Sequence, residues 1–281
     1  MPQYSRRAFA ALLVVLSVPP LHAQTADVRP IVVQGAMDSE VRALAARLDD
    51  SRLENIAAWP FWRGTVDGYP VIVSKTLKGM TNAAAATMLA VERFQPAAII
   101  NQGTSGGHDP SLHLYDIVIG TAAVNIGAFR TPYRKAGAGS TTVDWMALDL
   151  TLPDGSAGND PRARKLARFA GDARLLDIAT SVKAAYKRGR IVEGVIGSSD
   201  VWNDELDRIA HLNKAYGTLV EEMEAASVAQ IAGQLNVPFL GIRIVSDNTT
   251  NGDAYDPKTG EACQDFVYQV VKAYVASVKR P

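Results

Sequence analysis

The sequence predicts an α/β sandwich in which helices flank a central, largely buried sheet. Six short apolar runs have the length and composition of buried strands, and segments with helical periodicity separate them. This alternation is typical of α/β proteins, and a chain of 281 residues is long enough for one sizeable core. We find no internal repeat in the sequence, and we interpret residues 24–281 as a single domain.

The first 23 residues have the composition of an export signal. Arg6 and Arg7 precede the apolar stretch 10–18, and Ala23 ends a segment that resembles a cleavage site. The apolar stretch is shorter than the roughly 20 residues that cross a bilayer, so we expect no stable membrane anchoring. The paired arginines resemble a twin-arginine signal. We therefore expect a mature chain in the periplasm or outside the cell.

The expected elements follow one another along the chain. Strands are predicted over residues 30–34, 71–74, 97–101, 116–122, 191–196 and 237–246. Helices are predicted over residues 39–48, 83–94, 161–169, 175–187, 223–235 and 265–279. The segment 125–158 has turn-forming residues and no clear period, so we expect a surface excursion whose Phe129, Tyr133 and Trp145 line a site or a subunit contact.

Charge and cysteine content exclude several classes of function. The 29 basic and 29 acidic residues balance, and loss of the leader removes only Arg6 and Arg7 among them. Lys and Arg are not clustered as they are in proteins that bind nucleic acid or anionic membranes, so we expect no nucleic-acid partner. Cys263 is the only cysteine, which excludes an internal disulfide and a cysteine metal cluster. We interpret it as a small hydrophobe of the core.

The first predicted strand runs into a loop with Met37. Gly35 permits a tight turn, Asp38 or Ser39 can cap the following helix, and Glu40 then lies in the first helical turn. An acid at this place stabilises a helix through the helix dipole, which explains Glu40 without any function. Its position after a strand is also one where open sheets bind ligands.

The third predicted strand runs into a glycine-rich loop that contains Thr104, Ser105 and Gly106. Glycines let the backbone approach a ligand closely, and the hydroxyls can bind oxygens of a sugar or an anion. The loop matches neither the phosphate loop nor the dinucleotide fingerprint, and no cofactor motif is visible. His108 and His113 flank the loop, but such a pair is typical of polar surface residues, and we expect no metal site.

Two later segments supply an aromatic ring and a buried cation. Small polar residues follow the strand that ends at Ile196, and then come Trp202 and Asn203. Trp202 can stack on a planar ligand, although a half-buried core tryptophan has the same pattern. Arg243 lies inside an apolar strand, where it needs a carboxylate partner to offset its desolvation. We expect Glu40 or another glutamate to be that partner.

Carboxylates also gather toward the end of the chain. Glu222, Met223 and Glu224 stand at the predicted start of a helix, and Ser246 and Asp247 close an apolar strand. Side chains placed at strand ends meet at the edge of an open α/β sheet where ligands bind. Cleavage of an N-glycosidic bond needs one carboxyl to protonate the leaving group and another to activate water on the opposite face. The arrangement therefore indicates glycosidic-bond cleavage.

Four motifs occur in an order that resembles one family. They are Gly-Ala-Met-x-x-Glu from Gly35, Asn-x-Gly-Thr-Ser-Gly-Gly-x-x-Pro-Ser-Leu from Asn101, Val-Glu-x-Met-Glu-Ala from Val220 and Arg-x-x-Ser-Asp from Arg243. Together they resemble the purine nucleoside phosphorylase and nucleosidase superfamily, and within it the 5'-methylthioadenosine/S-adenosylhomocysteine nucleosidases. The resemblance spans residues 30–278. It implies a three-layer sandwich with a central mixed β-sheet, a homodimer, and a small-molecule purine nucleoside as the partner.

The resemblance also implies catalytic roles. Asp247 would protonate a purine ring nitrogen, with Ser246 orienting it, and Glu40 would activate the attacking water with help from Arg243 and Thr104. To act near neutral pH, Asp247 needs a pKa raised by burial. In the resembled family an aspartate at this place goes with 6-aminopurines, so we expect adenine nucleosides as substrates.

Further residues would bind the substrate. The resemblance puts Glu224 on the ribose hydroxyls, Met223 under the sugar and Trp202 against the base. The full set that we expect to bind substrate comprises Glu224, Met223, Glu222, Thr104, Ser105, Gly106, Trp202, Asn203, Met80 and Met37. The loop 78–82 departs from the family's pattern, so contacts near the 5' end of the ribose are expected to differ.

Two other functions remain open. A phosphorylase would share the fold and the base site but needs basic groups aimed at phosphate. Near Glu40 the sequence offers only Arg42, which points away on the predicted helix, and the acid itself repels phosphate. A non-catalytic exported nucleoside-binding protein would not need both an acid and a base, so Glu40 together with Asp247 argues against it. Export indicates salvage of external nucleosides, because the family's usual substrates are cytosolic.

Overall fold

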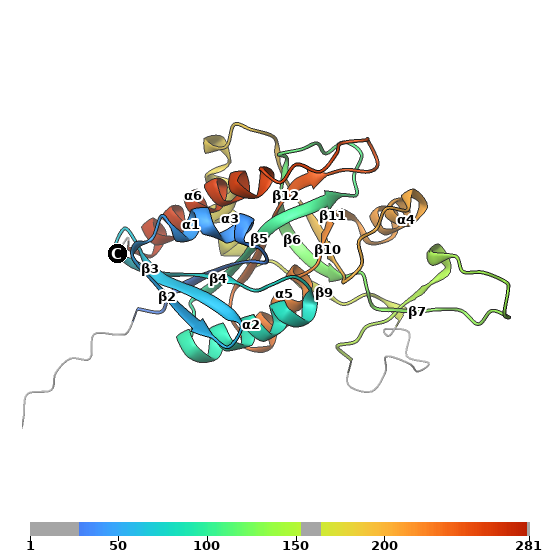
Figure 1. Cartoon of the computed structure of the whole chain (residues 1–281), viewed down its shortest axis with the longest axis horizontal. Helices are drawn as coiled ribbons and strands as arrows, with labels where there is room; N and C mark the ends of the chain where they lie inside the picture. Colours follow the sequence, from blue (N-terminus) through green and yellow to red (C-terminus); the bar gives the residue numbers. More distant parts are fainter. Residues whose placement is uncertain (1–27, 153–163, 280–281) are drawn as a thin grey trace, which may run out of the picture.

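The computed structural model describes residues 28–152 and 164–279. The predicted export signal, residues 1–23, lies outside the described residues. In the described part of the chain, ten strands form one mixed sheet and helices cover both of its faces (Figure 1). The predicted three-layer α/β sandwich with a central mixed sheet is therefore confirmed.

The order of the strands explains how distant segments meet. From one edge it runs β11 (Thr218–Glu222), β10 (Ile191–Ser198), β6 (Ile117–Asn125), β12 (Phe239–Asp247), β5 (Ala98–Gly107), β1 (Ile31–Gly35), β4 (Tyr69–Lys75), β3 (Trp59–Val66) and β2 (Asp49–Ile56), with β9 (Arg168–Ala170) beside β6. Because β11 also pairs with β5, five of these strands close into a ring. In that pairing Glu221 lies opposite Gly106, and Asp247 lies opposite the same Gly106 from β12. The carboxyl ends of β5, β11 and β12 therefore converge.

Helices bury apolar stripes on both faces of the sheet (Figure 1). Their bounds are α1 (Asp38–Ala45), α3 (Ala173–Ser181) and α6 (Thr259–Lys279) on one face, and α2 (Met80–Phe94) and α5 (Ala225–Gln234) on the other. Leu44 of α1 and Phe266 of α6 belong to one core, and Ala90 of α2 and Val228 of α5 to the other. Cys263 on α6 is fully buried in the first core, which confirms its interpretation as a core hydrophobe.

The segment predicted as an excursion does leave the body of the molecule (Figure 1). It carries the short hairpin of β7 (Phe129–Arg130) and β8 (Met146–Ala147) and a 3-10 turn, Thr142–Asp144. It packs beside α4 (Leu206–Tyr216), where the Arg208 guanidinium lies 4.6 Å from the Phe129 ring centroid and 5.3 Å from that of Trp145. Tyr133 is 90% exposed. These aromatic residues hold the excursion to α4 and leave one large ring in solvent.

Two of the predicted helices are wrong in part. The helix expected over residues 161–169 is not present in its described portion, because Arg168–Ala170 pairs with β6 as strand β9. The helix expected over residues 175–187 ends at Ser181, and a 3-10 turn, Lys183–Ala185, follows Val182. In the first case backbone pairing with a neighbouring strand outweighs local propensity. In the second a β-branched residue stands where the α-helix stops.

Other elements escaped prediction altogether. Strands β2 and β3 form an antiparallel hairpin whose first strand is mostly exposed and polar, so it has no apolar run to reveal it. Helix α4 was also missed. Residues Val220–Glu222, expected near a helix start, end strand β11, and α5 begins only after Glu224. Within the described residues, every helix is too short or too polar to cross a membrane.

Candidate active site

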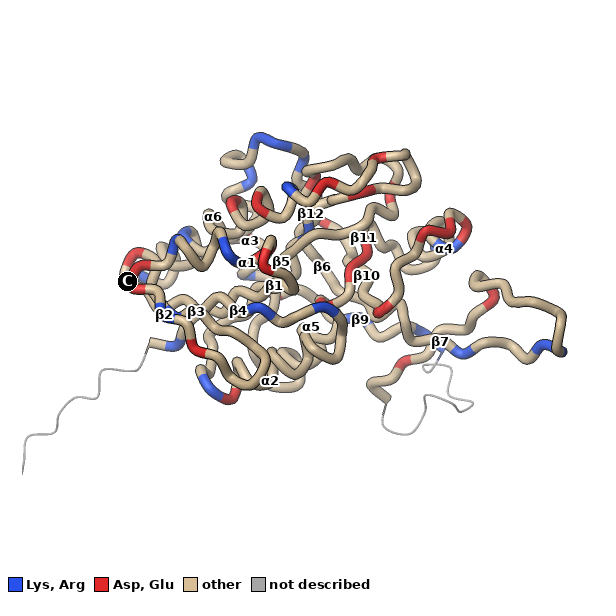
Figure 2. Tube along the Cα trace, viewed as in Figure 1, with Lys and Arg blue, Asp and Glu red and all other residues tan. Residues whose placement is uncertain are grey.

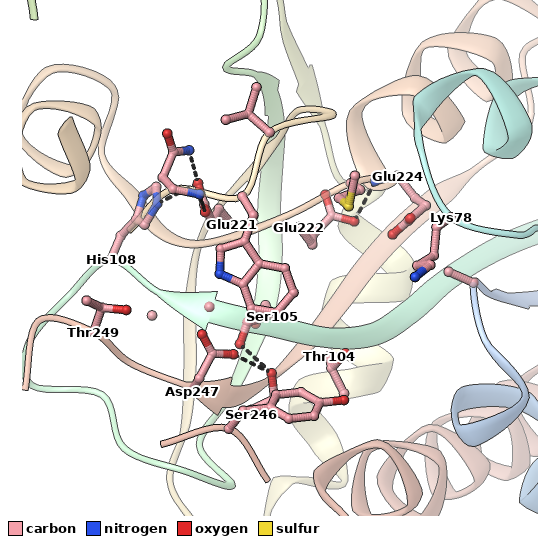
Figure 3. A pocket seen from close by; sticks show the side chains of 18 of the residues that line it. Lys78, Thr104, Ser105, His108, Glu221, Glu222, Glu224, Ser246, Asp247 and Thr249 are labelled. Carbon is pink, nitrogen blue, oxygen red and sulfur yellow. Dashed lines mark hydrogen bonds and ion pairs between the residues drawn. The ribbon is translucent and has the colours of Figure 1, made fainter. Parts of the chain in front are cut away.

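A cavity of about 290 Å³ opens at the carboxyl ends of β1, β5, β11 and β12 and beside the loop after β10. Twelve of the residues selected from the sequence line it, namely Met37, Glu40, Thr104, Ser105, Gly106, Trp202, Asn203, Glu222, Met223, Glu224, Ser246 and Asp247. Figure 3 shows Asp247 and Ser246 on one wall and Glu222 and Glu224 on another. The folded chain thus brings together segments more than two hundred residues apart.

Four hydrogen bonds hold the carboxylate of Glu40. The backbone N–H groups of Ala36 and Met37 donate to Oε2 at 2.8 and 3.1 Å. Thr104 donates to Oε1 from both its backbone N–H and its hydroxyl, each at 2.8 Å. Gly103 permits this close approach, because a Cβ there would lie 2.7 Å from Oε1. Glu40 is therefore a fixed acceptor at the cavity wall.

The start of α1 differs from the predicted capping. Met37 is the residue that precedes the helix, in place of Asp38 or Ser39, and it has an extended backbone. Glu40, the third residue after Met37, reaches back to the N–H groups of Ala36 and Met37, as the glutamate of a capping box does. The helix start and the position of the Glu40 carboxylate therefore depend on each other.

Arg243 is fully buried and is tied to Glu222. Its Nε donates to Glu222 Oε2 at 3.1 Å, Nη2 also bonds that oxygen, and Nη1 donates to the Asn101 carbonyl at 3.0 Å. Burial disfavours the charged guanidinium, but the carboxylates of Glu222, Glu224 and Glu40 outweigh it and raise the pKa of Arg243. The expected glutamate partner is thus Glu222. Arg243 itself does not line the cavity, so it can act there only through the carboxylates around it.

Glu222 and Glu224 line the wall of the cavity next to Arg243 and Gly79. The Glu222 carboxylate accepts hydrogen bonds from the backbone N–H groups of Glu224 and Ala225 and from the Ser198 hydroxyl. Glu224 is held by the backbone N–H of Gly79, 2.9 Å from Oε1. Burial and the neighbouring Glu222 carboxylate raise the pKa of Glu224 to about 8. Glu224 can therefore both donate and accept hydrogen bonds near neutral pH.

Asp247 closes β12 at an irregularity in the strand. The register against β5 shifts between Val245 and Asp247, so the extra residue, Ser246, lies beside the carboxylate that it bonds. The Ser246 hydroxyl donates to Asp247 Oδ1 at 2.8 Å. Burial raises the pKa of Asp247 against the opposing effect of that hydroxyl, with further support from the carboxylates of Asp204 and Glu221. A proton on Asp247 is thus favoured beyond the usual range of an aspartate.

Sequence reasoning missed a second polar cluster in the cavity wall. Glu221 Oε2 lies 3.0 Å from Nε2 of His108, and Glu221 accepts hydrogen bonds from the Asn203 backbone N–H at 2.9 Å and its amide at 2.5 Å. The Nδ1 atom of His108 lies 2.8 Å from the Thr218 hydroxyl. The prediction of two surface histidines is therefore wrong for His108, which is buried, and right for His113, which is exposed. Its burial follows from the pairing of β5 with β11, which the sequence around His108 does not reveal.

Two further predicted residues lie differently from expectation. Trp202 lines the cavity but is 65% exposed, so it is not a half-buried core residue and stands at the mouth. The structure does not place Met80 at the cavity: its side chain packs against the core under α2, and its N–H donates to Asp200 at 2.8 Å. Lys78 lines the cavity in its place. Among residues 28–152 and 164–279, no three His, Cys, Asp or Glu side chains are grouped as metal ligands would be.

The fold and this site belong to one class of protein. The sequence pattern that defines the phosphorylase superfamily matches residues 30–279, so the chain belongs to this superfamily. More particularly, it is 32% identical to the 5'-methylthioadenosine/S-adenosylhomocysteine nucleosidase of Bacillus cytotoxicus over 252 residues, which cover 86% of this chain and 98% of that protein. It is 33% identical to the nucleosidase of the same name from Anoxybacillus flavithermus, over 77% of this chain and 84% of the relative.

Solved structures of nucleosidases with the same name also resemble this chain. The Neisseria meningitidis 5'-methylthioadenosine/S-adenosylhomocysteine nucleosidase, in complex with methylthio-immucillin-A, matches with a TM-score of 0.70 and 25% identity over 87% of this chain and 99% of that chain. The corresponding nucleosidase of Colwellia psychrerythraea, in complex with adenine, matches with a TM-score of 0.68 and 25% identity over 88% of this chain and 95% of that chain.

Proposed function

We propose that the chain hydrolyses the N-glycosidic bond of adenine nucleosides and releases adenine and a ribose derivative. One observation carries the proposal: two carboxyl groups with different surroundings face the same cavity. Asp247 has a raised pKa and suits proton donation, whereas Glu40 accepts four hydrogen bonds and suits proton acceptance. The nucleosidases to which the chain is similar have names that describe this reaction.

The proposed chemistry begins with the base. Asp247 gives its proton to a purine ring nitrogen, and the glycosidic bond breaks with its electron pair leaving on the base. The sugar then has oxocarbenium character. A water molecule attacks the anomeric carbon as Glu40 takes a proton from it, and Glu224 accepts hydrogen bonds from the ribose hydroxyls. Arg243 acts as a positioning residue, because its contacts are to Glu222 and Asn101.

The test is chromatographic analysis of residues 24–281 incubated with 5'-methylthioadenosine, adenosine or inosine, with and without phosphate. We expect free adenine and free sugar without phosphate, and poor reaction of inosine. If product appears only with phosphate, the reaction is phosphorolysis and not hydrolysis. Tight nucleoside binding without any product would favour a non-catalytic binding protein.

Variants assign the roles. Asp247→Asn and Glu40→Gln are expected to lower kcat by about a hundredfold or more, the usual effect of removing a general acid or base. Asp38→Asn is the matched control, because Asp38 is on the same helix as Glu40, pairs with Lys75 on the surface and does not line the cavity. Equal losses in all three variants would contradict the assignment.

We further infer that the chain is exported and works as a homodimer. Residues 1–23 support export through their paired arginines and short apolar stretch. Cell fractionation of the full chain and of the Arg6→Lys, Arg7→Lys variant tests this, since retention of the variant in the cytoplasm is expected.

Light scattering of the mature chain tests the proposed homodimer, and a monomer at micromolar concentration would contradict it.

A further inference from the structure

The cavity has two chemically different ends. Figure 3 shows Asp247, Glu221 and His108 at one end, and Glu224 and Lys78 at the other. The proposed function puts the base against Asp247 and the sugar against Glu224. Any group attached to the sugar and directed away from the base therefore lies at the end that holds Lys78.

Lys78 is presented to the cavity by a well-held loop between β4 and α2. The next residue, Gly79, donates its N–H to Glu224 Oε1 at 2.9 Å, and the Lys78 carbonyl accepts a hydrogen bond from the Asn82 amide at 2.8 Å. Gly79 has a φ of +96°, which strongly favours glycine at this position. The backbone of Lys78 is thus fixed beside Glu224, and the residue is exposed.

The ammonium group of Lys78 is available for a ligand. In residues 28–152 and 164–279, Lys78 is the only Lys or Arg that lines the cavity, and its Nζ has no ion pair or hydrogen bond to a described residue. By contrast, the nearby Lys75 is paired with Asp38 at 3.0 Å. Apolar side chains of Ala36 and Met37 line the same cavity. A free cation at a partly apolar wall is suited to an anionic group of the substrate.

The ribose offers one place for such a group. Its 2' and 3' hydroxyls donate to Glu224 in the proposed function, and an anionic group attached to either of them would remove that hydrogen bond. The 5' carbon is the remaining position for a substituent. Free phosphate as a nucleophile would have to approach Glu40, which repels it.

We propose that Lys78 binds an anionic group carried on the 5' carbon of the adenine nucleoside, either a phosphate or a carboxylate. This inference rests on the proposed function. It makes the 5' end of the site a charge-selective subsite and distinguishes nucleosides that share the same base and sugar.

The experiment compares kcat/KM for adenosine, adenosine 5'-monophosphate and S-adenosylhomocysteine with the mature chain and its variants. The readout is the ratio of each charged substrate to adenosine, measured on the same preparation, so that any inactive fraction cancels. In Lys78→Met we expect at least one ratio to fall by about tenfold, the effect of losing one charge-assisted contact. Lys78→Arg should retain the ratio. Lys75→Met, which removes the same charge three residues earlier, should leave it unchanged.

The outcomes separate the possible sources of the anion and the two proposals. A fall for the monophosphate alone identifies a phosphate subsite, and a fall for S-adenosylhomocysteine alone identifies a carboxylate subsite. Ratios that stay constant in Lys78→Met, or a wild-type chain that cleaves adenosine but neither charged substrate, overturn the inference and leave the proposed function intact. If the wild-type chain releases no adenine from any of the three substrates, both the proposed function and the inference on Lys78 are overturned.

Discussion

Thr104 donates two hydrogen bonds to one oxygen of Glu40, from its backbone N–H and from its hydroxyl, both at 2.8 Å. The two residues come from different strand ends, since Thr104 is in β5 and Glu40 follows β1. The bonds fix the face that Glu40 turns toward the cavity. The orientation of a carboxylate matters to catalysis alongside its basicity, because a base acts only within hydrogen-bond reach of the proton that it abstracts.

Loss of the Thr104 hydroxyl should therefore weaken catalysis more than binding. Thr104→Val keeps the backbone bond to Glu40 and removes the side-chain bond. We expect kcat for adenosine to fall by about tenfold, with little change in KM, from the loss of one hydrogen bond to a charged group. Thr180→Val is the control, since the Thr180 hydroxyl bonds Glu193 at 3.0 Å on the surface. A change in KM alone would show that Thr104 only binds substrate.

The pH dependence of activity should follow the proton on Asp247. The protonated form is the active one, and burial raises its pKa, so activity is retained to a higher pH than for an exposed aspartate and is lost as the pH rises through that pKa. The alkaline limb of log kcat/KM for adenosine measures it. Ser246→Ala removes a hydrogen bond that lowers the pKa, so the limb should move to higher pH. If the alkaline limb does not move in Ser246→Ala, it reports the titration of a group other than Asp247.

Removal of the buried charge at Arg243 should destabilise the fold. Arg243→Met leaves Glu222 buried without its cation, and we expect a loss of about 3–5 kcal/mol in the free energy of unfolding. Arg47→Met is the control, because Arg47 forms a partly exposed ion pair with Asp265 that is worth about 0–1 kcal/mol. Urea denaturation of both variants measures the difference. Equal stabilities would mean that Glu222 takes up a proton at little cost.

The contact between His108 and Glu221 should support the loop that carries Trp202. Glu221 accepts hydrogen bonds from both the backbone and the side chain of Asn203, the residue after Trp202, and Nε2 of buried His108 lies 3.0 Å from Glu221 Oε2. In His108→Asn we expect a severalfold increase in KM for adenosine with a smaller change in kcat. His113→Asn, on the exposed side of the same loop, should leave both constants unchanged. A loss of kcat alone would place His108 in the chemistry instead.

The strands and most of the site could be predicted because their signals are local. The runs that became β1, β5, β10 and β12 are apolar, and polar residues follow each of them. Strand β2 could not be predicted, since it is stabilised by pairing with β3 and has few buried side chains. Neither could the partner of Arg243, because the choice between Glu40 and Glu222 depends on tertiary packing.

The buried position of His108 shows the same limit. As a sequence it is a polar residue after two glycines, which is typical of a surface loop. In the fold, β5 continues through Gly107 to pair with β11, and the His108 backbone N–H donates to the Leu219 carbonyl at 2.9 Å. A pairing between segments more than one hundred residues apart thus carries the histidine inward. No local pattern contains that information.

Cys263 is fully buried between α6 and the sheet, and burial raises the pKa of its thiol to about 12. At neutral pH it is therefore both protonated and sheltered, so a thiol reagent reacts only when this part of the molecule opens. Since the chain has no other cysteine, the rate of labelling reports the exposure of this one site, whether α6 separates from the sheet or the whole domain unfolds. The molecule carries its own probe for such opening, with no need to introduce one.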